Sequence, residues 1–390
     1  MRSKHASADQ AREWFRTYTR DLSGEDLQRL FTHDTRDAYE FFARGLDTDQ
    51  FAGMPWWKAF PLRVRQFFVA FTLRLPPARR VLYIAAVAFA LVGLLQLFRQ
   101  FERVSVPLGT PFFQLPVPVP VWENGTFTLI VSLLLFNLLV LLEVADRLSL
   151  KGELEVAREI QLAMLPRGTY AVGDIEICGV TRPANTVGGD FYDVLPMADG
   201  SIVMALGDVA GKGSPAALLM ALLLAVLRTL VDEQLPPPAL AERLNVQISR
   251  HSPGSRFITL FLAIYQPDTG ELTYVNAGQN PPLIRRASGR FERLAATGMA
   301  LGMFEQATFG AVETRVQPGD LLVLYSDGIT EAEDPTGRPL EESGLELLIQ
   351  RHASETPAAL NTRVLTAVEA HAQRSKLSDD LTILVLKRAA

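Results

Sequence analysis

The chain has 390 residues, a formal net charge of −5 and a hydrophobic fraction of 48%. At roughly 100–200 residues per domain, this length predicts two or three domains. Lys and Arg are scattered along an acidic chain, which excludes a basic nucleic-acid-binding protein. Cys178 is the single cysteine, so an intramolecular disulfide framework and a thiolate zinc cluster are also excluded. We expect Cys178 to be a small core residue on a strand.

Residues 1–80 are expected to form an N-terminal cytoplasmic helical region. Apolar residues recur with helical spacing over residues 1–60. The stretch from Phe51 to Leu75 is aromatic and basic, and two alternatives are open for it. It lies on the membrane surface, or it packs its aromatic side chains inward as a small helical subdomain.

Residues 81–98 and 124–142 are two uncharged apolar stretches, and each is predicted to be a transmembrane helix. At 1.5 Å per residue each spans roughly 27–29 Å, about the hydrocarbon thickness of a bilayer. The alternative is a pair of buried core helices. Cations flank the pair on its outer sides, before the first stretch and after the second, while the connector at 99–123 holds only Arg99 and Arg103. The positive-inside rule therefore places both termini of this multi-pass membrane protein, whose spans contact lipid, in the cytoplasm.

The connector is predicted to be extended, polyproline-like chain. Its segment from Leu115 to Val121 alternates proline with valine, and the whole connector is too short for a sensor domain.

Residues 143–166 are predicted to form a linker helix that Pro166 ends. One apolar stripe has a 4-3-4-3 spacing and a second stripe widens it, which is typical of a short coiled coil. We expect a parallel homodimer through this helix; the alternative is one amphipathic helix lying on its own domain. The first stripe comprises Leu150, Leu154, Ala157 and Met164 with Gln161 between, and the second comprises Val156, Ile160 and Ala163.

After Pro166 the pattern changes to short β-rich runs with helices between them in no regular βαβ alternation. This mixture predicts an α+β layered domain with largely antiparallel sheets. Strands are predicted over Ile175–Val180, Ser201–Leu206, Phe257–Tyr265, Glu271–Val275, Leu321–Tyr325 and Leu381–Leu386, and helices near 215–231, 238–250, 341–352 and 357–373.

Four acidic segments lie at ends of these predicted strands. One such Asp followed by Gly is often only a turn, but four in one domain indicate a carboxylate cluster. Carboxylates brought together repel one another unless protons or cations neutralise them, and oxygen ligands without His or Cys favour Mg²⁺ or Mn²⁺. The segments are Gly188–Asp193, Gly207–Gly213, Tyr325–Gly328 and Ser378–Thr382.

Two other mechanisms fit the sequence less well. All five histidines lie outside the acidic segments, which disfavours a His-dependent mechanism. Gly211-Lys212-Gly213 lacks the spacing of a nucleotide-binding P-loop, so its glycines are expected to permit a tight turn before a helix that starts at Ser214-Pro215. That helix is apolar nearly all round, hence expected to be buried.

From about residue 153 to 387 the chain resembles the SpoIIE/RsbU branch of the PP2C (PPM) phosphatases. Seven strings match in order, and one departure is Gln279, where the family usually has His. The strings are AREIQ-AMLP at 157–166, P-NTVGGDFYD at 183–193, GDVAGKG at 207–213, F-TLF at 257–261, NAG-NPP at 276–282, LYSDGITEA at 324–332 and SDDLT at 378–382.

The resemblance implies that residues 167–390 form an αββα sandwich of two mainly antiparallel sheets that binds two Mn²⁺ or Mg²⁺ ions. Asp208 would bridge both metals and act with Asp190 in catalysis. The Val209 carbonyl is implied as a further ligand. Asp327 would hold the first metal together with one of Asp379 and Asp380, where Asp379 is favoured, and Asp190 would contribute to the second.

The resemblance also implies a function and a mode of regulation. The substrate would be phosphoserine or phosphothreonine on a regulatory protein, typically an anti-anti-sigma protein of the STAS type in a partner-switching pathway, attacked by a water that two metals activate. The linker helix would be a regulatory element, through Ile160, Gln161, Leu165 and Pro166. Two alternatives are a catalytically silent membrane adaptor with the same fold and a nucleotidyl cyclase or kinase output domain.

Overall fold

The computed structural model describes residues 55–99, 101–107, 114–120, 123–252, 256–373 and 378–390. Contacts between Cα atoms divide the chain into two compact units, Met1–Arg147 and Leu148–Ala390. The helical patterning expected over residues 1–54 lies outside the described residues.

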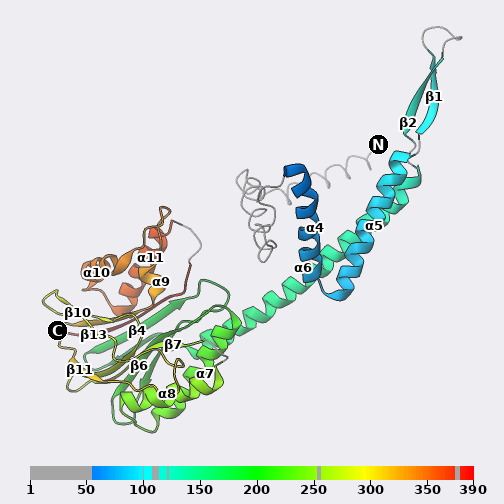
Figure 1. Cartoon of the computed structure of the whole chain (residues 1–390). Helices are drawn as coiled ribbons and strands as arrows, with labels where there is room; N and C mark the ends of the chain where they lie inside the picture. Colours follow the sequence, from blue (N-terminus) through cyan, green and yellow to red (C-terminus); the bar gives the residue numbers. More distant parts are fainter. Residues whose placement is uncertain (1–54, 100, 108–113, 121–122, 253–255, 374–377) are drawn as a thin grey trace, which may run out of the picture. The chain divides into compact units, whose positions relative to one another are not determined.

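Helices make up most of the described first unit. α4 spans Trp56–Arg74, α5 spans Pro77–Arg99, and α6 begins at Glu123 and ends at Met164, inside the second unit (Figure 1). The aromatic side chains of α4 divide between the two alternatives for this stretch. The rings of Phe68 and Phe71 pack against Tyr83 of α5 at centroid distances of 5.7 and 5.2 Å, whereas Trp57 and Phe60 are exposed.

The described parts of the connector are extended, as predicted, but they pair as two β-strands instead of forming polyproline-like chain. β1, Phe101–Pro107, pairs antiparallel with β2, Gln114–Pro120, in a register that places Phe101 opposite Pro120. The prolines of β2 fall at every second position. In a strand, alternate N–H groups point to the same side, so prolines spaced by two can all turn their missing donor away from the partner strand.

α5 and the first half of α6 approach each other closely because small residues lie between them. A Cβ on Gly93 would come within 2.7 Å of Thr128 Oγ1, and one on Gly125 within 2.7 Å of the Gly93 carbonyl oxygen. Ser132 Oγ donates a hydrogen bond of 2.8 Å to the carbonyl of Ala86. Such contacts are typical of helix pairs in membranes, where small residues let backbones touch.

Three described helices are long and apolar enough to cross a membrane: Pro77–Leu97, Gly125–Met164 and Ser214–Val231. The third is α7, and 44% of its apolar window is buried, against 11% and 6% for the other two. α7 belongs to the second unit, where it packs on strand β6. Its expected burial is confirmed on one side only, because Leu218 is 72% exposed.

The second unit contains two antiparallel sheets. The six-stranded sheet has the order β10-β9-β12-β13-β4-β3 and the five-stranded sheet the order β11-β8-β7-β6-β5. The bounds of the strands are β3 Thr169–Val172, β4 Ile175–Arg182, β5 Phe191–Pro196, β6 Ile202–Val209, β7 Ile258–Gln266, β8 Glu271–Ala277, β9 Leu283–Arg285, β10 Phe291–Arg293, β11 Val312–Arg315, β12 Leu321–Tyr325 and β13 Leu381–Arg388.

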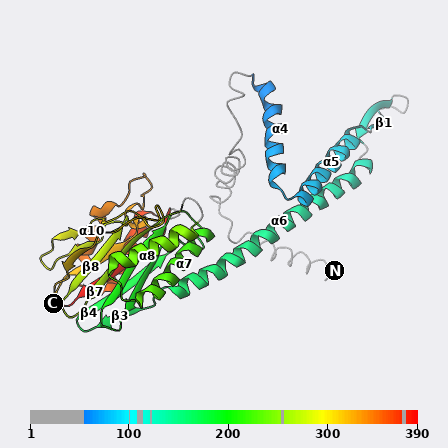
Figure 2. The ribbon, with the colours of Figure 1, turned by 60° about the horizontal axis from the view of Figure 1, so that its bottom comes forward.

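Helices cover the outer face of each sheet, which completes the expected αββα sandwich (Figures 1 and 2). α7 and α8 pack on the five-stranded sheet, and α11 packs on β4 and β13 of the six-stranded sheet beside α10. The bounds are α7 Ser214–Val231, α8 Pro237–His251, α9 Asp327–Thr330, α10 Glu341–His352 and α11 Pro357–His371.

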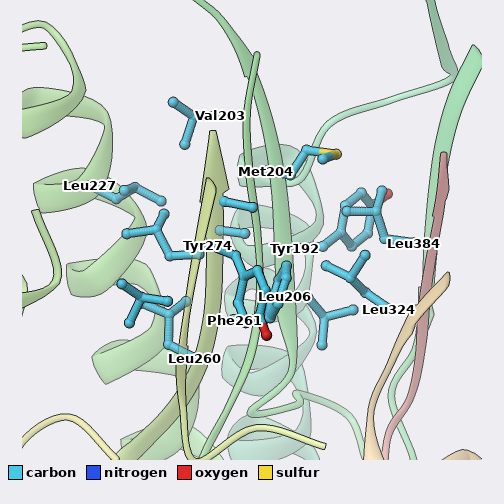
Figure 3. Close-up of a cluster of buried hydrophobic side chains, with 14 of the residues drawn as sticks. Tyr192, Val203, Met204, Leu206, Leu227, Leu260, Phe261, Tyr274, Leu324 and Leu384 are labelled. Carbon is cyan, nitrogen blue, oxygen red and sulfur yellow. The ribbon is translucent and has the colours of Figure 1, made fainter. Parts of the chain in front are cut away.

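The period-2 alternation of β12 divides its side chains between two cores. Leu322 and Leu324 face the core between the sheets, where Leu324 lies near Leu384 and Tyr192 (Figure 3). Leu321 and Val323 point the other way, into the cluster under α10 and α11. Continuous apolar runs such as Leu321–Leu324 are typical of strands buried on both faces.

The strands and helices predicted for this unit are confirmed to within a few residues, whereas β3, β5, β9, β10, β11 and α9 were not predicted. The missed elements are short, and β3, β10 and β11 have partly exposed side chains that give no apolar run. Cys178 lies on β4 as expected, but it is only partly buried.

Candidate active site

Strand pairing places Asp190 and Asp208 side by side. Antiparallel pairing of β5 with β6 sets Phe191 opposite Gly207. Phe191 directly follows Asp190, and Gly207 directly precedes Asp208. Gly189 allows the close approach, because a Cβ there would lie 2.8 Å from Asp208 Oδ1 and 3.0 Å from the Val209 carbonyl oxygen. Thus Asp208 and Val209 O face the same small space next to Asp190.

The six-stranded sheet brings Asp327 to the start of β13. Pairing of β12 with β13 sets Tyr325 opposite Ile383, and Ser326 N–H donates to the carbonyl of Thr382 at 2.9 Å. Asp327 follows this point of β12, and Asp379 and Asp380 directly precede β13. The close packing needs glycine at 328, where a Cβ would lie 2.1 Å from the Asp380 carbonyl oxygen.

Asp380 ties the two groups together through backbone N–H donors. Its Oδ1 accepts a hydrogen bond of 2.7 Å from Ala184 N–H, and its Oδ2 accepts one of 2.7 Å from Gly189 N–H. Asp379 is instead 40% exposed and forms an ion pair of 3.0 Å with Lys212 Nζ. The two neighbours therefore have different surroundings. Both carboxylate oxygens of Asp380 accept hydrogen bonds from backbone N–H groups, whereas Asp379 pairs with the Lys212 side chain near the surface.

Asp190 is buried, with 3% of its surface exposed, and its Oδ2 has no hydrogen-bond partner. Burial, and next the negative charge of Asp208, raise the pKa of Asp190 well above its usual value. A buried carboxylate oxygen without a donor is costly, so this atom is available to a cation or a water.

Burial and the charges of the other carboxylates raise the pKa of Asp208. Burial raises its pKa to about 7, and the charges of Asp327, Asp379 and Asp380 add to the effect. The pKa of Asp327 is likewise raised, first by burial and then by Asp379. These mutual effects show that the structure brings together all five predicted acidic residues.

The donors fit divalent cations. They are carboxylate and carbonyl oxygens, the type that Mg²⁺ and Mn²⁺ favour, and they include the unpartnered Oδ2 of Asp190. Among the described residues no three His, Cys, Asp or Glu side chains already close around one point as a finished metal-binding set.

The linker helix α6 contacts this site through Gln161, which is 4% exposed. Gln161 Nε2 donates to the Gly188 carbonyl at 2.7 Å, and Gly188 N–H donates to Gln161 Oε1 at 3.1 Å. Gln161 is therefore hydrogen-bonded through its side-chain amide to the backbone of Gly188, two residues before Asp190. Of the other predicted regulatory residues, Leu165 is buried in the core, Pro166 accepts a hydrogen bond of 2.9 Å from Tyr192, and Ile160 is 59% exposed.

A buried ion pair fixes the end of the same helix, and sequence reasoning missed it. Arg228 of α7 donates from Nε to Asp193 Oδ2 at 2.8 Å and from Nη2 to the carbonyl of Met164, the last residue of α6. Asp193 is 1% exposed. Asp193 was noted only as part of an acidic segment, and the structure gives it this structural role on β5.

Thr259 and Gln279 lie behind Asp208. Thr259 Oγ1 donates to Gln279 Oε1 at 2.5 Å and lies 3.3 Å from both the N–H and the carbonyl oxygen of Asp208. Gln279 Nε2 donates to the Tyr325 carbonyl at 3.3 Å. The residue that departs from the family pattern therefore links the ends of β6 and β12 and contacts the site from behind.

Comparisons with known proteins agree with this arrangement. Residues 198–389 match the family model described as Stage II sporulation protein E (SpoIIE). The chain is 30% identical over 240 residues to "Phosphoserine phosphatase RsbU" of Bacillus subtilis, covering 61% of this chain and 71% of RsbU. It is 30% identical over 281 residues to "Protein IcfG" of Synechocystis, covering 64% of this chain and 43% of IcfG.

Among solved structures, the SiaA-PP2C domain of Pseudomonas aeruginosa matches with a TM-score of 0.55 at 19% identity. The match covers 62% of this chain and 98% of that domain. At this identity the likeness concerns the fold, and it supports the two-sheet sandwich described above.

Proposed function

The chain belongs to the SpoIIE-type family of PP2C serine/threonine phosphatases, and we propose that it hydrolyses phosphoserine or phosphothreonine on a regulatory protein with the help of two Mn²⁺ or Mg²⁺ ions. The observation that carries this proposal is the cluster of five carboxylates around the unpartnered Oδ2 of Asp190. A silent adaptor would be expected to lack some of these acids, and none is missing.

We assign the ligands as follows. Asp208 would serve both ions, the Val209 carbonyl and Asp190 would contribute to one of them, and Asp327 and Asp379 would hold the other. Ions bound there supply a lowered pKa for a bound water and neutralise the charge of the phosphoryl group. Asp380 is assigned a structural role, since Ala184 and Gly189 already occupy its two oxygens.

The chain's own groups position the attack. Asp190 Oδ2 is a free acceptor that can orient a water toward phosphorus and take its proton. No covalent intermediate on the protein is required.

The proposed substrate is a phosphorylated regulatory protein, in the first place an anti-anti-sigma protein of the STAS type. Support comes from the name of RsbU, a phosphoserine phosphatase that this chain covers over 71% of its length. The test is phosphate release from phosphoserine and phosphothreonine peptides by the full chain in detergent. Release that requires Mn²⁺ or Mg²⁺ is expected, and no release with either ion would contradict the proposal.

The proposed location is the bacterial inner or plasma membrane, with α5 and the first part of α6 as the two spans in contact with lipid and both termini in the cytoplasm. Support comes from the length and apolar character of the two helices and from their low burial. The polar contacts between Arg79 and both Glu143 and Asp146 tie the ends of the spans together on the side that the cations mark as cytoplasmic.

We further propose that the linker helix forms a homodimer through its exposed stripe. In the second unit the two predicted stripes of α6 separate. Of the first stripe, Gln161 is buried and Leu154 and Ala157 are partly buried. Leu150, Val156 and Ile160 are 58%, 58% and 59% exposed. An apolar stripe spaced four residues apart and open to solvent suits a second copy of the same helix.

Gln161 offers a direct test of coupling between the linker helix and the site. Substitution Gln161→Ala removes both hydrogen bonds to Gly188, so the loop that carries Asp190 is held less firmly. We expect about a 10- to 100-fold loss of activity, the size typical of groups that orient metal ligands, with a higher half-saturating Mn²⁺ concentration. Glu159→Ala, two residues away at an exposed position of the same helix, is the control for metal affinity. Equal Mn²⁺ dependence in wild type and Gln161→Ala would contradict the coupling.

Asp379 and Asp380 should separate by phenotype. Asp380→Ala leaves two buried N–H donors unpaired and is expected to cost about 2–3 kcal/mol of unfolding free energy. Asp379→Ala loses only a surface ion pair with Lys212, worth little stability, yet should abolish metal-dependent phosphate release. Thermal unfolding measures the stability of each variant, and phosphate release measures its activity. If Asp380→Ala abolished release without loss of stability and Asp379→Ala did not abolish it, the ligand would be Asp380.

A further inference from the structure

Arg256 has a buried nitrogen without a partner. Its Nη1 is the only side-chain nitrogen among the described residues that is buried and makes no hydrogen bond. In the described second unit, other partly buried arginines such as Arg286 and Arg388 are paired with carboxylates. Arg256 as a whole is only partly buried, but a buried nitrogen without an acceptor is costly, and an anion can supply that acceptor.

The guanidinium lies against the loop that follows the metal-site strand. A Cβ on Gly211 would be 3.9 Å from both Cζ and Nη1 of Arg256. The backbone keeps the two segments together, since Ala210 N–H donates to the Phe257 carbonyl at 2.9 Å. Gly211 is three residues after Asp208, so Arg256 lies beside the carboxylate cluster and makes no ion pair with it.

The same loop presents further donors. No hydrogen bond from the N–H groups of Gly211, Lys212 or Gly213 to a described residue is present. α7 begins directly afterwards at Ser214, and no side chain caps its N-terminus. The N-terminus of this 18-residue helix carries partial positive charge. Pro215 has no N–H, and Ala216 and Ala217 donate to the Gly213 carbonyl, so Ser214 N–H is the donor that its first turn offers to an anion.

We propose that Arg256, the loop Gly211–Gly213 and the N-terminus of α7 form the subsite that binds the phosphoryl oxygens of the substrate monoester. This inference rests on the proposed phosphatase function. A guanidinium fits phosphate through two parallel hydrogen bonds, and the glycines let the anion approach the backbone.

The test compares Arg256→Gln and Arg256→Lys with the control Arg250→Gln, all in the full chain in detergent. Arg250 is 60% exposed and pairs with Glu305 at 2.8 Å, so its loss changes the same charge without touching the loop. Steady-state kinetics use p-nitrophenyl phosphate and a phosphoserine peptide, and calorimetry measures binding of inorganic phosphate in the presence of Mg²⁺. Melting temperature and Mg²⁺ affinity check the fold and the metal site.

For Arg256→Gln we expect KM for both substrates, and Kd for inorganic phosphate, to rise about 10- to 100-fold, the size of a lost charge-assisted hydrogen bond. Arg256→Lys should fall between, and Arg250→Gln should match wild type. Unchanged phosphate binding in a folded Arg256→Gln overturns the proposal. So does an effect on the peptide alone, which would mean that Arg256 contacts flanking acidic residues. If wild type binds phosphate through Arg256 but hydrolyses neither substrate, the subsite stands and the phosphatase function fails.

Discussion

Substitution Asp208→Asn is expected to lower phosphate release by roughly 10³-fold or more, because the bridging position contributes several kcal/mol of charge stabilisation in the transition state. Asn keeps the shape of the side chain and one carbonyl oxygen but loses the negative charge that two cations would share. The neighbouring backbone contacts of Asp208 to Thr259 are retained, so the fold should remain intact. Phosphate release and Mn²⁺ binding of the purified full chain measure the effect.

Substitution Asp208→Asn lowers activity, but in the metal-free protein it should reduce the loss of stability that occurs as pH rises. Asp208 has a pKa of about 7 in the folded chain and 3.8 as its ordinary value. A raised pKa means that the folded state holds the proton more tightly, so the stability from protonated Asp208 is complete below about pH 4 and is lost as pH rises through about 7. In a chelator, the wild-type melting temperature should therefore fall between pH 5 and pH 7.5, and Asp208→Asn should fall less.

Asp268→Asn is the matched control, since it makes the same charge change on an exposed residue of the β7–β8 turn. It should leave activity, Mn²⁺ binding and the pH dependence of melting as in wild type. Wild-type activity in Asp208→Asn would remove Asp208 from the centre of the site.

Substitution Arg228→Ala should destabilise the fold about as much as Asp380→Ala. It leaves the carboxylate of Asp193, 1% exposed, without its cation and frees the carbonyl of Met164 at the end of α6. We expect a loss of about 2–3 kcal/mol, less than for a fully buried pair because Arg228 is 37% exposed. In a domain of this size the melting temperature should fall roughly 5–10 °C.

Activity should also fall in Arg228→Ala, because the end of the linker helix is then held by fewer contacts and Gln161 lies on its last turns. Arg243→Ala is the control: Arg243 pairs with Glu233 on the surface, with both side chains about half exposed. A surface pair contributes little, so this variant should melt within about 2 °C of wild type. Equal melting temperatures for the two variants would mean that the Asp193 pair carries no special weight.

The acidic residues could be predicted because local pattern and chemistry agree. An Asp beside Gly at the end of an apolar strand can be read from adjacent letters, and four such segments in one domain indicate a shared site. The same holds for the strands Leu321–Tyr325 and Leu381–Arg388, whose apolar runs are long enough to mark strands buried on both faces.

The contacts that surround the acids could not be predicted, because they join residues far apart in the chain. The family resemblance named Gln161 as a regulatory residue, but its two hydrogen bonds to Gly188 depend on how α6 docks and could not be predicted. Arg228 reads as an ordinary charge at the end of a helix, and Arg256 as one of many scattered cations. The pairing of β1 with β2 was not predicted, because prolines at every second position fit both polyproline chain and an edge strand.

The central claim is that the five carboxylates bind two divalent cations on which phosphate release depends. Calorimetric titration of Mn²⁺ into the metal-free full chain, with phosphate release followed over the same concentrations, tests it most directly. Two Mn²⁺ per chain are predicted, with release from a phosphoserine peptide rising as the sites fill and falling to background in a chelator. Absence of Mn²⁺ and Mg²⁺ binding, or release that persists unchanged in the chelator, would contradict it.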